Sequence, residues 1–334
     1  MEHNQVLALT HKEDGTADLV INKILEKGGR CVRFNTEDYP EKVKITMFLD
    51  GSKFDGCIKF NNDTLNFKDI ATVWYRRPHN PSVTSISDSV AKNWVEEESL
   101  YALRCLWTLL EDKFWVNSLL SCEKIQFNKW HQMIIANKVG LSTPLSILAN
   151  CHKDIVRLCR NVKGDLALKV IKNVAVNYDN KTLLLHTKRV SQVEIEKTSP
   201  KAFEFSPIFL QKYIDKKLEL RITVIRDKVF ACEIHSQDNE KTLEDWRKHV
   251  FLKDELPHNP CELPAEIESM CVLLVRKLGL YFGAIDMILT PDDKYVFLEV
   301  NPNGQWGWIE ELTKMPISSA MADLLMSKQK CPVS

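Results

Sequence analysis

The sequence predicts a mixed fold in which an N-terminal α/β domain precedes an α+β region, and three observations predict it. Apolar runs of strand length alternate with helically spaced segments through the first third of the chain. Strands and helices go on alternating from residue 143, and two apolar stretches near the C-terminus flank the turn residues Asp292 and Asp293. A chain of 334 residues allows about two to three domains.

The first third follows an α/β order. A strand at 6–11 precedes a helix over 18–27, which Gly28 and Gly29 end, and a second strand lies at 31–34. The other expected elements are strands at 43–49, 57–60 and 70–75 and an amphipathic helix over 87–110 with Ser87 or Asp88 as its cap.

Residues 116–118 mark a boundary, after which the pattern becomes α+β. A helix is expected over 123–139, where Gly140 ends it. The elements expected after it are a strand at 145–149, a helix over 152–161, a strand at 166–171, a hairpin-like segment at 172–190, a helix around 191–204, strands within 208–235 around a turn at 226–228, a helix over 265–278, a hairpin of 283–290 with 295–300, and a helix over 317–327.

Composition excludes several classes of protein. Forty-five Lys and Arg balance forty-five Asp and Glu, so no general attraction to nucleic acid or to an anionic membrane is expected. Apolar runs such as 271–275 are far too short to span a membrane, and the N-terminus does not read as a signal peptide. The ten cysteines include no CxxC pair, which favours a reduced cytoplasmic chain without a zinc site. With eleven glycines, the chain has neither a P-loop motif nor a GxSxG motif.

A carboxylate-bearing hairpin, GAIDMILTPDDKYVFLEVNPNGQW, is the sharpest cluster. In an antiparallel hairpin about the Asp292-Asp293 turn, Asp286 lies opposite Glu299, and Glu299 shares a face with Asn301. Two carboxylates and an amide oxygen suit Mg²⁺. A solvated polar face is the alternative. The apolar residues beside Asp286 and Glu299 disfavour it, because an unpaired charge in such a stretch is costly.

Two lysines are candidate anion ligands. Lys129 lies on the helix after the boundary, and Lys169 lies inside the apolar strand LALKVI. A lysine within an apolar strand needs an anionic partner, such as a phosphate, or must extend its ammonium group to water at the strand end. Both readings stay open for Lys169, whereas an ordinary solvated lysine is the simpler reading of Lys129 alone.

The segment PIFLQKYIDKKLELRITVI combines a hinge with an alternating strand. Its backbone at 211–214 is suited to reading the edge of an adenine ring. Glu219 and Arg221 share one face, where a carboxylate would accept from ribose hydroxyls and a guanidinium would meet phosphate or an acyl intermediate. Taken alone, the pattern favours an amphipathic strand with a Glu/Arg ladder.

Two further spots carry cationic side chains. Arg247, beside Asp245, is suited to clamping phosphoryl oxygens. Arg76 and Arg77 follow a buried strand at the expected crevice of the first domain, where an ion pair between domains is an equally good reading.

Read in order, these residues resemble the ATP-grasp superfamily over most of the chain, and most of all its peptide-modifying ligases, the graspetide macrocyclases of the microviridin type. The matching words are WYRRP at 74–78, Asn128-Lys129, FLQKYIDKKLELRITVI, Asp-Trp-Arg at 245–247 and FLEVNPNGQWGW at 297–308. One departure is the segment KNVAVNYDN after the second lysine, which lacks the glycine-rich phosphate loop of many ATP-grasp ligases.

The resemblance implies a three-part ATP-grasp fold. Its parts are an N-terminal α/β domain at 1–118, a central domain with a hairpin and helix for leader docking at 119–210, and a C-terminal domain with the metal site at 211–334. It implies ATP and Mg²⁺, with two ions, as cofactors. The implied ATP ligands are Lys129, Lys169, Gln211, Lys212, Tyr213, Ile214 and Glu219, and the implied metal ligands are Asp286, Glu299 and Asn301.

The implied chemistry is macrocyclisation of a ribosomally made precursor peptide. A substrate Asp or Glu carboxylate becomes an acyl phosphate, and a Thr or Ser hydroxyl or a Lys amine then displaces phosphate to close an ester or amide ring. Arg221 and Arg247 would stabilise the anionic intermediate, and Arg76 and Arg77 would attract the acidic peptide. His235 and Asp245 are candidates for a general base. The resemblance also implies a homodimer.

Other functions stay open from sequence alone. Another ATP-grasp carboxylate–amine ligase, such as a protein glutamate ligase or a glutathione-synthetase-like enzyme, would share the ATP site. A non-catalytic ATP-binding regulatory module would bind ATP without turnover. A plain structural α+β protein with chance motifs is the remaining reading.

Overall fold

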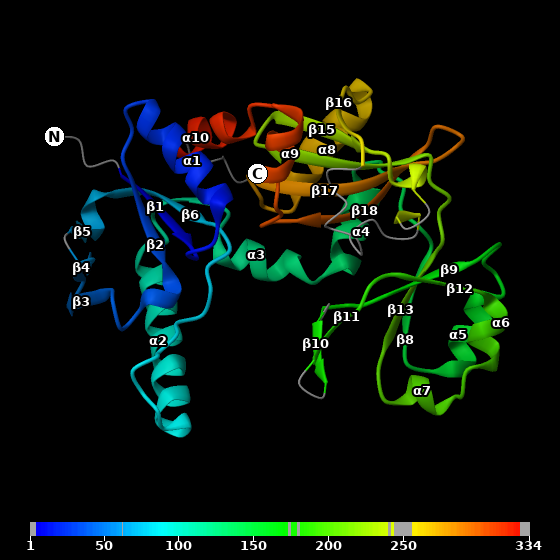
Figure 1. The fold of residues 1–334 in the computed structure, drawn as a ribbon, viewed down its shortest axis with the longest axis horizontal. Coiled ribbons are helices and arrows are strands. Elements are labelled where there is room, and N and C mark those ends of the chain that lie inside the picture. The colour runs from blue at the N-terminus through cyan, green and yellow to red at the C-terminus, as the bar shows by residue number, and fades with distance from the viewer. Residues whose placement is uncertain are drawn as a thin grey trace.

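The protein is described here by a computed structural model that covers residues 5–61, 63–172, 175–178, 181–239, 242–243 and 256–327. It consists of an N-terminal α/β unit, a small α+β unit and a larger unit built on an antiparallel sheet (Figure 1). This architecture confirms the predicted fold class. No helix in the described ranges is both long enough and apolar enough to cross a membrane.

The N-terminal unit is built on a parallel sheet that is buried on both faces. Val6 and Ala8 of its central strand pack toward α1, whereas Leu7 and Leu9 pack toward α2, so the strand reads as a continuous apolar run. The sheet order is β2 (Cys31–Asn35), β1 (Gln5–Thr10), β6 (Ile70–Tyr75) and β7 (Phe114–Val116), and its helices are α1 (Gly15–Glu26) and α2 (Ser89–Leu109). A separate antiparallel sheet consists of β3 (Lys44–Asp50), β4 (Lys53–Lys59) and β5 (Thr64–Asn66).

Two short helices link this unit to the rest, where the sequence predicts one helix over 123–139. They are α3 (Leu119–Gln126) and α4 (Lys129–Lys138). Asn128 separates them because its side chain accepts a hydrogen bond from the His131 N–H at 3.1 Å, which is an N-cap contact. Lys129 therefore stands at the first turn of α4 rather than in the middle of a helix.

The small unit is a four-stranded sheet with helices on one face. The sheet order is β12 (Lys188–Val190), β9 (Leu166–Lys169), β13 (Ile208–Lys212) and β8 (Ser146–Ala149), and the helices are α5 (His152–Cys159), α6 (Gln192–Lys197) and α7 (Lys201–Glu204). The predicted helix around 191–204 is thus two helices with Pro200 between them. Strands β10 (Ala175–Tyr178) and β11 (Lys181–Leu184) pair only with each other among the described strands.

The large unit is a five-stranded antiparallel sheet whose two faces differ. The sheet order is β16 (His258–Cys261), β15 (Lys228–Ile234), β14 (Leu218–Ile225), β17 (Phe282–Leu289) and β18 (Tyr295–Asn301). One face packs against α8 (Ala265–Lys277) and α4, with Leu220, Ile222 and Met287 in that core. The alternating strand β14 turns Glu219 and Arg221 to the other face, which carries the polar site described below.

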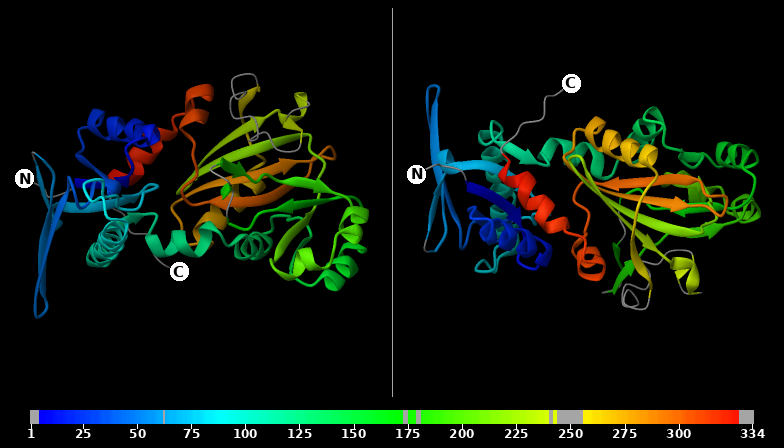
Figure 2. Two further views of the ribbon diagram at one scale, coloured as in Figure 1. Left: turned by 60° about the horizontal axis from the view of Figure 1, so that its bottom comes forward. Right: turned by 90° about the horizontal axis from the view of Figure 1, so that it is seen from above.

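The last two helices return to the beginning of the chain. Helix α9 (Gly307–Thr313) leads to α10 (Ile317–Met326), which lies beside α1 (Figure 2). Val20 and Ile24 of α1 share one buried core with Met321 and Leu325 of α10. The segment predicted as a third domain, 211–334, is therefore divided in space, and its predicted boundary at residue 210 falls inside β13.

Gly304 lies in the loop that joins β18 to α9, and its lack of a side chain is required by packing. A Cβ atom at this position would stand 2.4 Å from the Cβ of Ala284 on β17. We expect Gly304→Ala to lower the free energy of unfolding by about 1–3 kcal/mol, because neither the loop nor the strand has room to give. Urea unfolding monitored by tryptophan fluorescence measures the effect.

Gly15→Ala is the matched control for this change. No heavy atom lies within 4 Å of its added Cβ, and the residue begins a helix. Its effect should be neutral or slightly stabilising. Equal stability of the two variants would contradict the packing argument.

Candidate functional site

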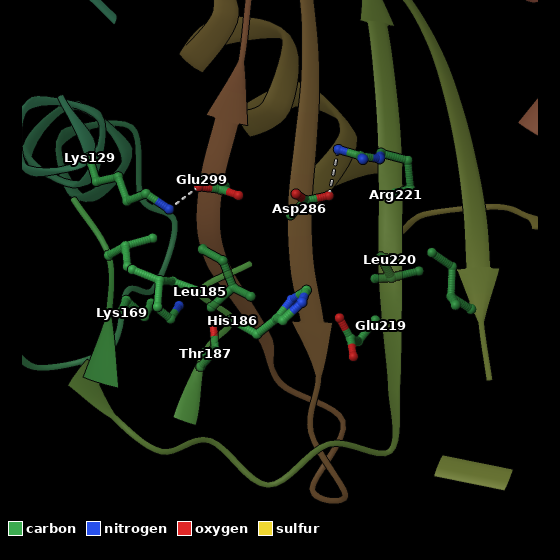
Figure 3. Close-up of a pocket in the computed structure, with 13 residues that line it drawn as sticks. Lys129, Lys169, Leu185, His186, Thr187, Glu219, Leu220, Arg221, Asp286 and Glu299 are labelled. Carbon is green, nitrogen blue, oxygen red and sulfur yellow. Dashed lines mark hydrogen bonds and ion pairs between the residues drawn. The ribbon is translucent and has the colours of Figure 1, made fainter. Parts of the chain in front are cut away.

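A cavity of about 320 Å³ lies between the small sheet and the polar face of the large sheet (Figure 3). It brings together residues from α4, β9, β14, β17 and β18 that are far apart in the sequence. Its lining consists of Lys129, Lys169, Val170, Leu185, His186, Thr187, Glu219, Leu220, Arg221, Ile234, Asp286, Leu298 and Glu299. Six of the residues that the sequence singles out therefore meet in one place: Lys129, Lys169, Glu219, Arg221, Asp286 and Glu299.

The two carboxylates face each other across neighbouring strands. Asp286 of β17 is the direct partner of Glu299 of β18, as the hairpin pattern predicts. The register is less regular than predicted, because the pairing passes from Asp286–Glu299 to Met287–Phe297 and leaves Leu298 without a partner.

This bulge changes which side chains reach the cavity. In a regular strand, Phe297 and Glu299 would share a face. Instead, Phe297 and Val300 are both buried in the core beneath the sheet, and Leu298 and Glu299 both line the cavity. The bulge thus supplies an apolar wall directly beside the carboxylate.

Each carboxylate has a cationic partner. The Lys129 ammonium pairs with Glu299, and a guanidinium nitrogen of Arg221 lies 2.8 Å from the Asp286 carboxylate (Figure 3). The side chains of Lys129 and Glu299 are 24% and 23% exposed, so this pair is open to exchange with solvent or a ligand. The site is therefore balanced in charge by neighbours that are themselves suited to binding anions.

Helix α4 fixes both Lys129 and the open edge of β18. The buried Gln132 carboxamide accepts from the Val300 N–H at 2.9 Å and donates to the Ile125 carbonyl oxygen at 2.8 Å. The carbonyl oxygen of Ser142 accepts from the Phe297 N–H at 2.8 Å. The edge strand that carries Glu299 is therefore covered rather than exposed.

A second, smaller cavity of about 70 Å³ shares Lys169, Thr187, Glu219 and Leu298 with the first. The predicted hinge lines it, with Gln211, Lys212, Tyr213 and Ile214 among its walls, beside Pro144, Ala167, Lys216 and Ile288. Lys169 and Glu219 thus lie where a ligand that fills both cavities would pass from one to the other.

The hinge itself uses part of its hydrogen-bonding capacity within the protein. The Lys212 N–H donates to the Leu145 carbonyl at 2.8 Å, and the Tyr213 N–H donates to that of Asp165 at 2.9 Å. The buried Gln211 side chain donates to the Ser146 hydroxyl at 2.9 Å, so it joins β13 to β8. In the described part of the chain, no backbone acceptor is recorded for the Ile214 N–H, which leaves it available at the cavity.

Glu219 is held in a fixed orientation at the boundary between the cavities. Its carboxylate accepts from Lys216 at 2.7 Å and from the Ser236 hydroxyl at 2.9 Å. Lys216 is nearly buried, at 6% side-chain exposure. A carboxylate so positioned presents its remaining acceptor capacity to the cavity.

Asn301 lies at the end of β18, outside the lining of the large cavity. It is exposed, it pairs with Ala284, and its side-chain oxygen accepts from the Asn303 N–H at 2.9 Å. The structure therefore keeps Asn301 on the strand of Glu299, but Asn301 does not line the cavity that the two carboxylates line.

Arg76 and Arg77 have opposite environments. Arg76 is 2% exposed, and its guanidinium contacts Asp14, Gln305 and the carbonyl oxygens of Asn303 and Gly304. Burial lowers the pKa of Arg76 to about 10, against the opposing effect of Asp14. The ion pair of Arg76 thus lies within the N-terminal unit, and its contacts with residues 303–305 are hydrogen bonds. These contacts favour a structural role for Arg76 over contact with a substrate. Arg77 is exposed and adopts a left-handed backbone conformation with φ of +50°.

The structure places only one of the three remaining candidates. Asp245 and Arg247 fall outside the described residues. His235 lies near Glu233 and Asp238, at 3.4 and 3.9 Å, and is not part of the lining. These contacts give no support to His235 as a general base.

His186, Thr187 and Leu298 line the cavity although sequence reasoning does not single them out. His186 points into the space near Asp286 and Glu219 (Figure 3). The segment LLLHTKRV offers one signal, a histidine and a threonine between apolar and basic residues, but it does not show which side faces the site.

The donor set fits Mg²⁺ completed by ligand oxygens. Asp286 and Glu299 are adjacent oxygen donors at a cavity wall, and Asn301 follows on the same strand. No group of three or more His, Cys, Asp or Glu side chains suited to a metal gathers within the described residues. Mg²⁺ is commonly held by one or two carboxylates together with substrate phosphates, which matches this set.

Comparison with known families gives two adjacent matches. Residues 5–123 match the MvdD pre-ATP grasp domain, and residues 126–325 match the RimK-like ATP-grasp domain. No match was found among curated protein sequences.

Solved structures give matches over nearly the whole chain. A RiPP-associated ATP-grasp ligase from Chryseobacterium gregarium, in complex with ADP and a leader and core peptide, is 31% identical with a TM-score of 0.89, and 98% of each chain is covered. The macrocyclase MdnC of Microcystis aeruginosa MRC, bound to the precursor peptide MdnA, is 26% identical with a TM-score of 0.83, over 97% of this chain and 99% of that one. The macrocyclase MdnB of the same organism is 29% identical with a TM-score of 0.78, over 96% and 99%.

The Lys129–Glu299 pair at the site and the buried Arg76–Asp14 pair of the N-terminal unit should contribute differently to the free energy of unfolding. We expect Lys129→Met to change the free energy of unfolding by less than about 1 kcal/mol, because its partner Glu299 can be rehydrated. We expect Arg76→Met to cost about 3–5 kcal/mol, because it leaves Asp14 charged and fully buried. Urea unfolding of the ligand-free protein measures both, and a larger loss for Lys129→Met would contradict this ranking.

Proposed function

Because the chain belongs to the RimK-like ATP-grasp family, we propose that it is an ATP-dependent ligase that macrocyclises a ribosomally made precursor peptide. The reaction joins an Asp or Glu side-chain carboxylate of the peptide to a Thr or Ser hydroxyl as an ester, or to a Lys amine as an amide. Similarity along the whole chain to ligases solved with precursor, leader and core peptides supports a peptide substrate.

One observation carries the proposal: the cavity holds a facing pair of carboxylates, Asp286 and Glu299, and two lysines in its walls, with a hinge at its far end. Carboxylates for a divalent cation and ammonium groups for phosphates are what a nucleotide triphosphate requires. The hinge offers backbone groups at the place where a base would lie.

Different residues of the cavity walls bind different parts of the nucleotide. Lys129 and Lys169 bind phosphate oxygens as point charges. The backbone of Gln211, Lys212, Tyr213 and Ile214 meets the adenine ring, for which the Ile214 N–H is available. Glu219, oriented by Lys216 and Ser236, accepts from the ribose hydroxyls.

For the metal, Asp286, Glu299 and Asn301 provide oxygen ligands. When bound, Mg²⁺ neutralises the charge that develops on the triphosphate during phosphoryl transfer. With nucleotide bound, Lys129 would be placed to pair with phosphate oxygens as well as with Glu299. The ion pairs of Lys129 with Glu299 and of Arg221 with Asp286 hold both carboxylates at the cavity wall.

The peptide reaction then proceeds in two steps. A substrate carboxylate oxygen attacks the γ-phosphorus of ATP, and the bond from this phosphorus to the oxygen that bridges to the β-phosphate breaks. ADP is released, and the substrate carboxylate becomes an acyl phosphate. The second substrate group attacks the acyl carbon, gives up its proton, and releases phosphate as the ring closes. Arg221 stabilises the anionic tetrahedral centre together with Arg247, and Arg77 attracts the acidic peptide. Asp245 remains a candidate for receiving the proton.

We propose that the leader peptide docks on the small unit. Strands β10 and β11 and helix α6 supply strand edges and a helix flank of the kinds that extended peptides recognise. We also propose that the enzyme works as a homodimer, which light scattering of the purified protein would test.

We expect Glu299→Gln to abolish cyclisation while the protein remains folded, because it removes one metal ligand charge from a side chain that is about a quarter exposed. The assay incubates a candidate precursor peptide, encoded beside the gene, with enzyme, ATP and Mg²⁺. Mass spectrometry should show successive losses of about 18 Da, one water per ring, for the wild type only.

Glu26→Gln is the matched control for this experiment. Glu26 is also paired with a lysine, Lys23, but lies on the surface of α1. It should cyclise at the wild-type rate. If Glu299→Gln cyclised as fast as Glu26→Gln, the metal assignment would be wrong, and a wild type that added free amino acids instead would indicate another carboxylate–amine ligase.

We expect Lys169→Met to weaken the binding of ADP with Mg²⁺ by about 10-fold or more, because charge-assisted hydrogen bonds contribute about 1.5–3 kcal/mol each. Isothermal titration calorimetry measures it. Lys163→Met, at an exposed position of the same unit, should bind ADP like the wild type. Wild-type affinity in Lys169→Met would remove Lys169 from the nucleotide site.

A further inference from the structure

The loop at 302–305 carries the chain out of β18 directly after Glu299 and Asn301, and residues of the N-terminal unit hold it. Two of them, Asn117 and Arg76, are each 2% exposed. Neither lines the cavity. In the sequence, Asn117 marks only the boundary at 116–118.

Asn117 joins the two strands of the carboxylate hairpin at their common end. Its side-chain oxygen accepts from the N–H groups of Tyr281 and Phe282 at 2.8 and 3.1 Å. Its side-chain nitrogen donates to the carbonyl oxygens of Phe282 and Pro302 at 2.8 and 2.9 Å. All the hydrogen-bonding directions of one carboxamide are used to tie the start of β17 to the end of β18.

Arg76 holds the next residues of the loop. One guanidinium nitrogen donates to the carbonyl oxygens of Asn303 and Gly304 at 3.1 and 2.9 Å, and the other pairs with the Gln305 side chain. Asp14 lies 3.2 Å away as the counter-charge, and the Thr10 hydroxyl donates to Asp14 at 2.9 Å. The fork of an arginine suits three acceptors in one plane better than an ammonium group does.

We call Asn117 and Arg76 together the clamp. Its contacts matter because they lie close to the carboxylates along the chain. Pro302 is three residues after Glu299, and Phe282 is four residues before Asp286. The last ladder pair of the hairpin is Ala284 with Asn301. Beyond this pair, Asn117 bridges the two strands, and Arg76 holds the loop that follows β18.

We propose that Asn117 and Arg76 are positioning residues, through which the N-terminal unit fixes Glu299 and Asn301 against Asp286 for metal binding. This inference rests on the proposed function in one respect, the assignment of those three residues as metal ligands. Residues that hold ligands in place typically change metal affinity or activity by about 10- to 100-fold when they are lost.

The test reads metal binding without any peptide. Mn²⁺ is titrated into the protein with saturating ADP and followed by electron paramagnetic resonance, and ADP affinity without metal is measured by calorimetry. We expect Asn117→Ala to weaken Mn²⁺ binding by about 10-fold or more and to leave metal-free ADP binding within about twofold, because the hinge lies in another unit. Arg76→Lys keeps a charge beside Asp14 but loses the fork, and its Mn²⁺ affinity should lie between those of Asn117→Ala and the wild type.

Trp115→Phe is the matched control. Trp115 lies two residues before Asn117, its indole N–H donates to the Leu110 carbonyl at 2.7 Å, and it does not contact the loop. This variant should lower the melting temperature and keep wild-type Mn²⁺ affinity. If Asn117→Ala and Arg76→Lys behaved in the same way, the clamp would be structural only and the inference would be overturned.

The outcomes separate this inference from the proposed function. A wild type that binds Mn²⁺ with ADP but cyclises no peptide would count against the function and leave the clamp supported by the variants. A wild type that binds no Mn²⁺ with ADP would overturn the inference itself. If Asn117→Ala does not fold, Arg76→Lys alone decides.

Discussion

Two acidic side chains on neighbouring strands repel each other, and much of this protein is arranged to keep them close. Cross-strand partners lie about 4.5–5.5 Å apart at their Cβ atoms, so the Asp286 and Glu299 carboxylates repel each other unless cations compensate their charge. Arg221 and Lys129 provide it from two different elements. Because Lys129 comes from α4 and Arg221 from β14, the charge balance joins the linking helix to the large sheet at this site.

The bulge at Leu298 and the clamp on the 302–305 loop both position Glu299. The bulge acts within β18, and the clamp acts directly after it. The bulge rotates Glu299 into the cavity while Phe297 and Val300 stay in the core. The clamp holds the strand where the ladder stops. Gln132 fixes β18 at its open edge, pairing with β17 fixes the other edge, and Asn117 fixes the end of the strand. The Glu299 carboxylate can still exchange its partner.

The sequence predicts much of this site, and its failures have physical causes. The pairing of Asp286 with Glu299 follows from strand periodicity, but the bulge does not, because nothing in VFLEV marks the residue that loses its partner. The single helix expected over 123–139 overlooks Asn128, whose capping contact divides it. The sequence leaves two readings of Arg76, a contact with the acidic peptide and an ion pair between domains, and only the fold shows that Asp14 and three acceptors from the far end of the chain surround it. The role of Asn117 depends on segments about 165 and 185 residues away, which no local pattern can reveal.

The return of α10 to α1 has a consequence for synthesis on the ribosome. The core between the sheet of the N-terminal unit and α1 stays incomplete until Met321 and Leu325 have been made, because these residues pack against Val20 and Ile24. The first domain therefore cannot finish folding as it emerges, although domains generally fold in order from the N-terminus. Its apolar core must be shielded for almost the whole of translation, and the unit that holds the 302–305 loop in place is among the last to become complete.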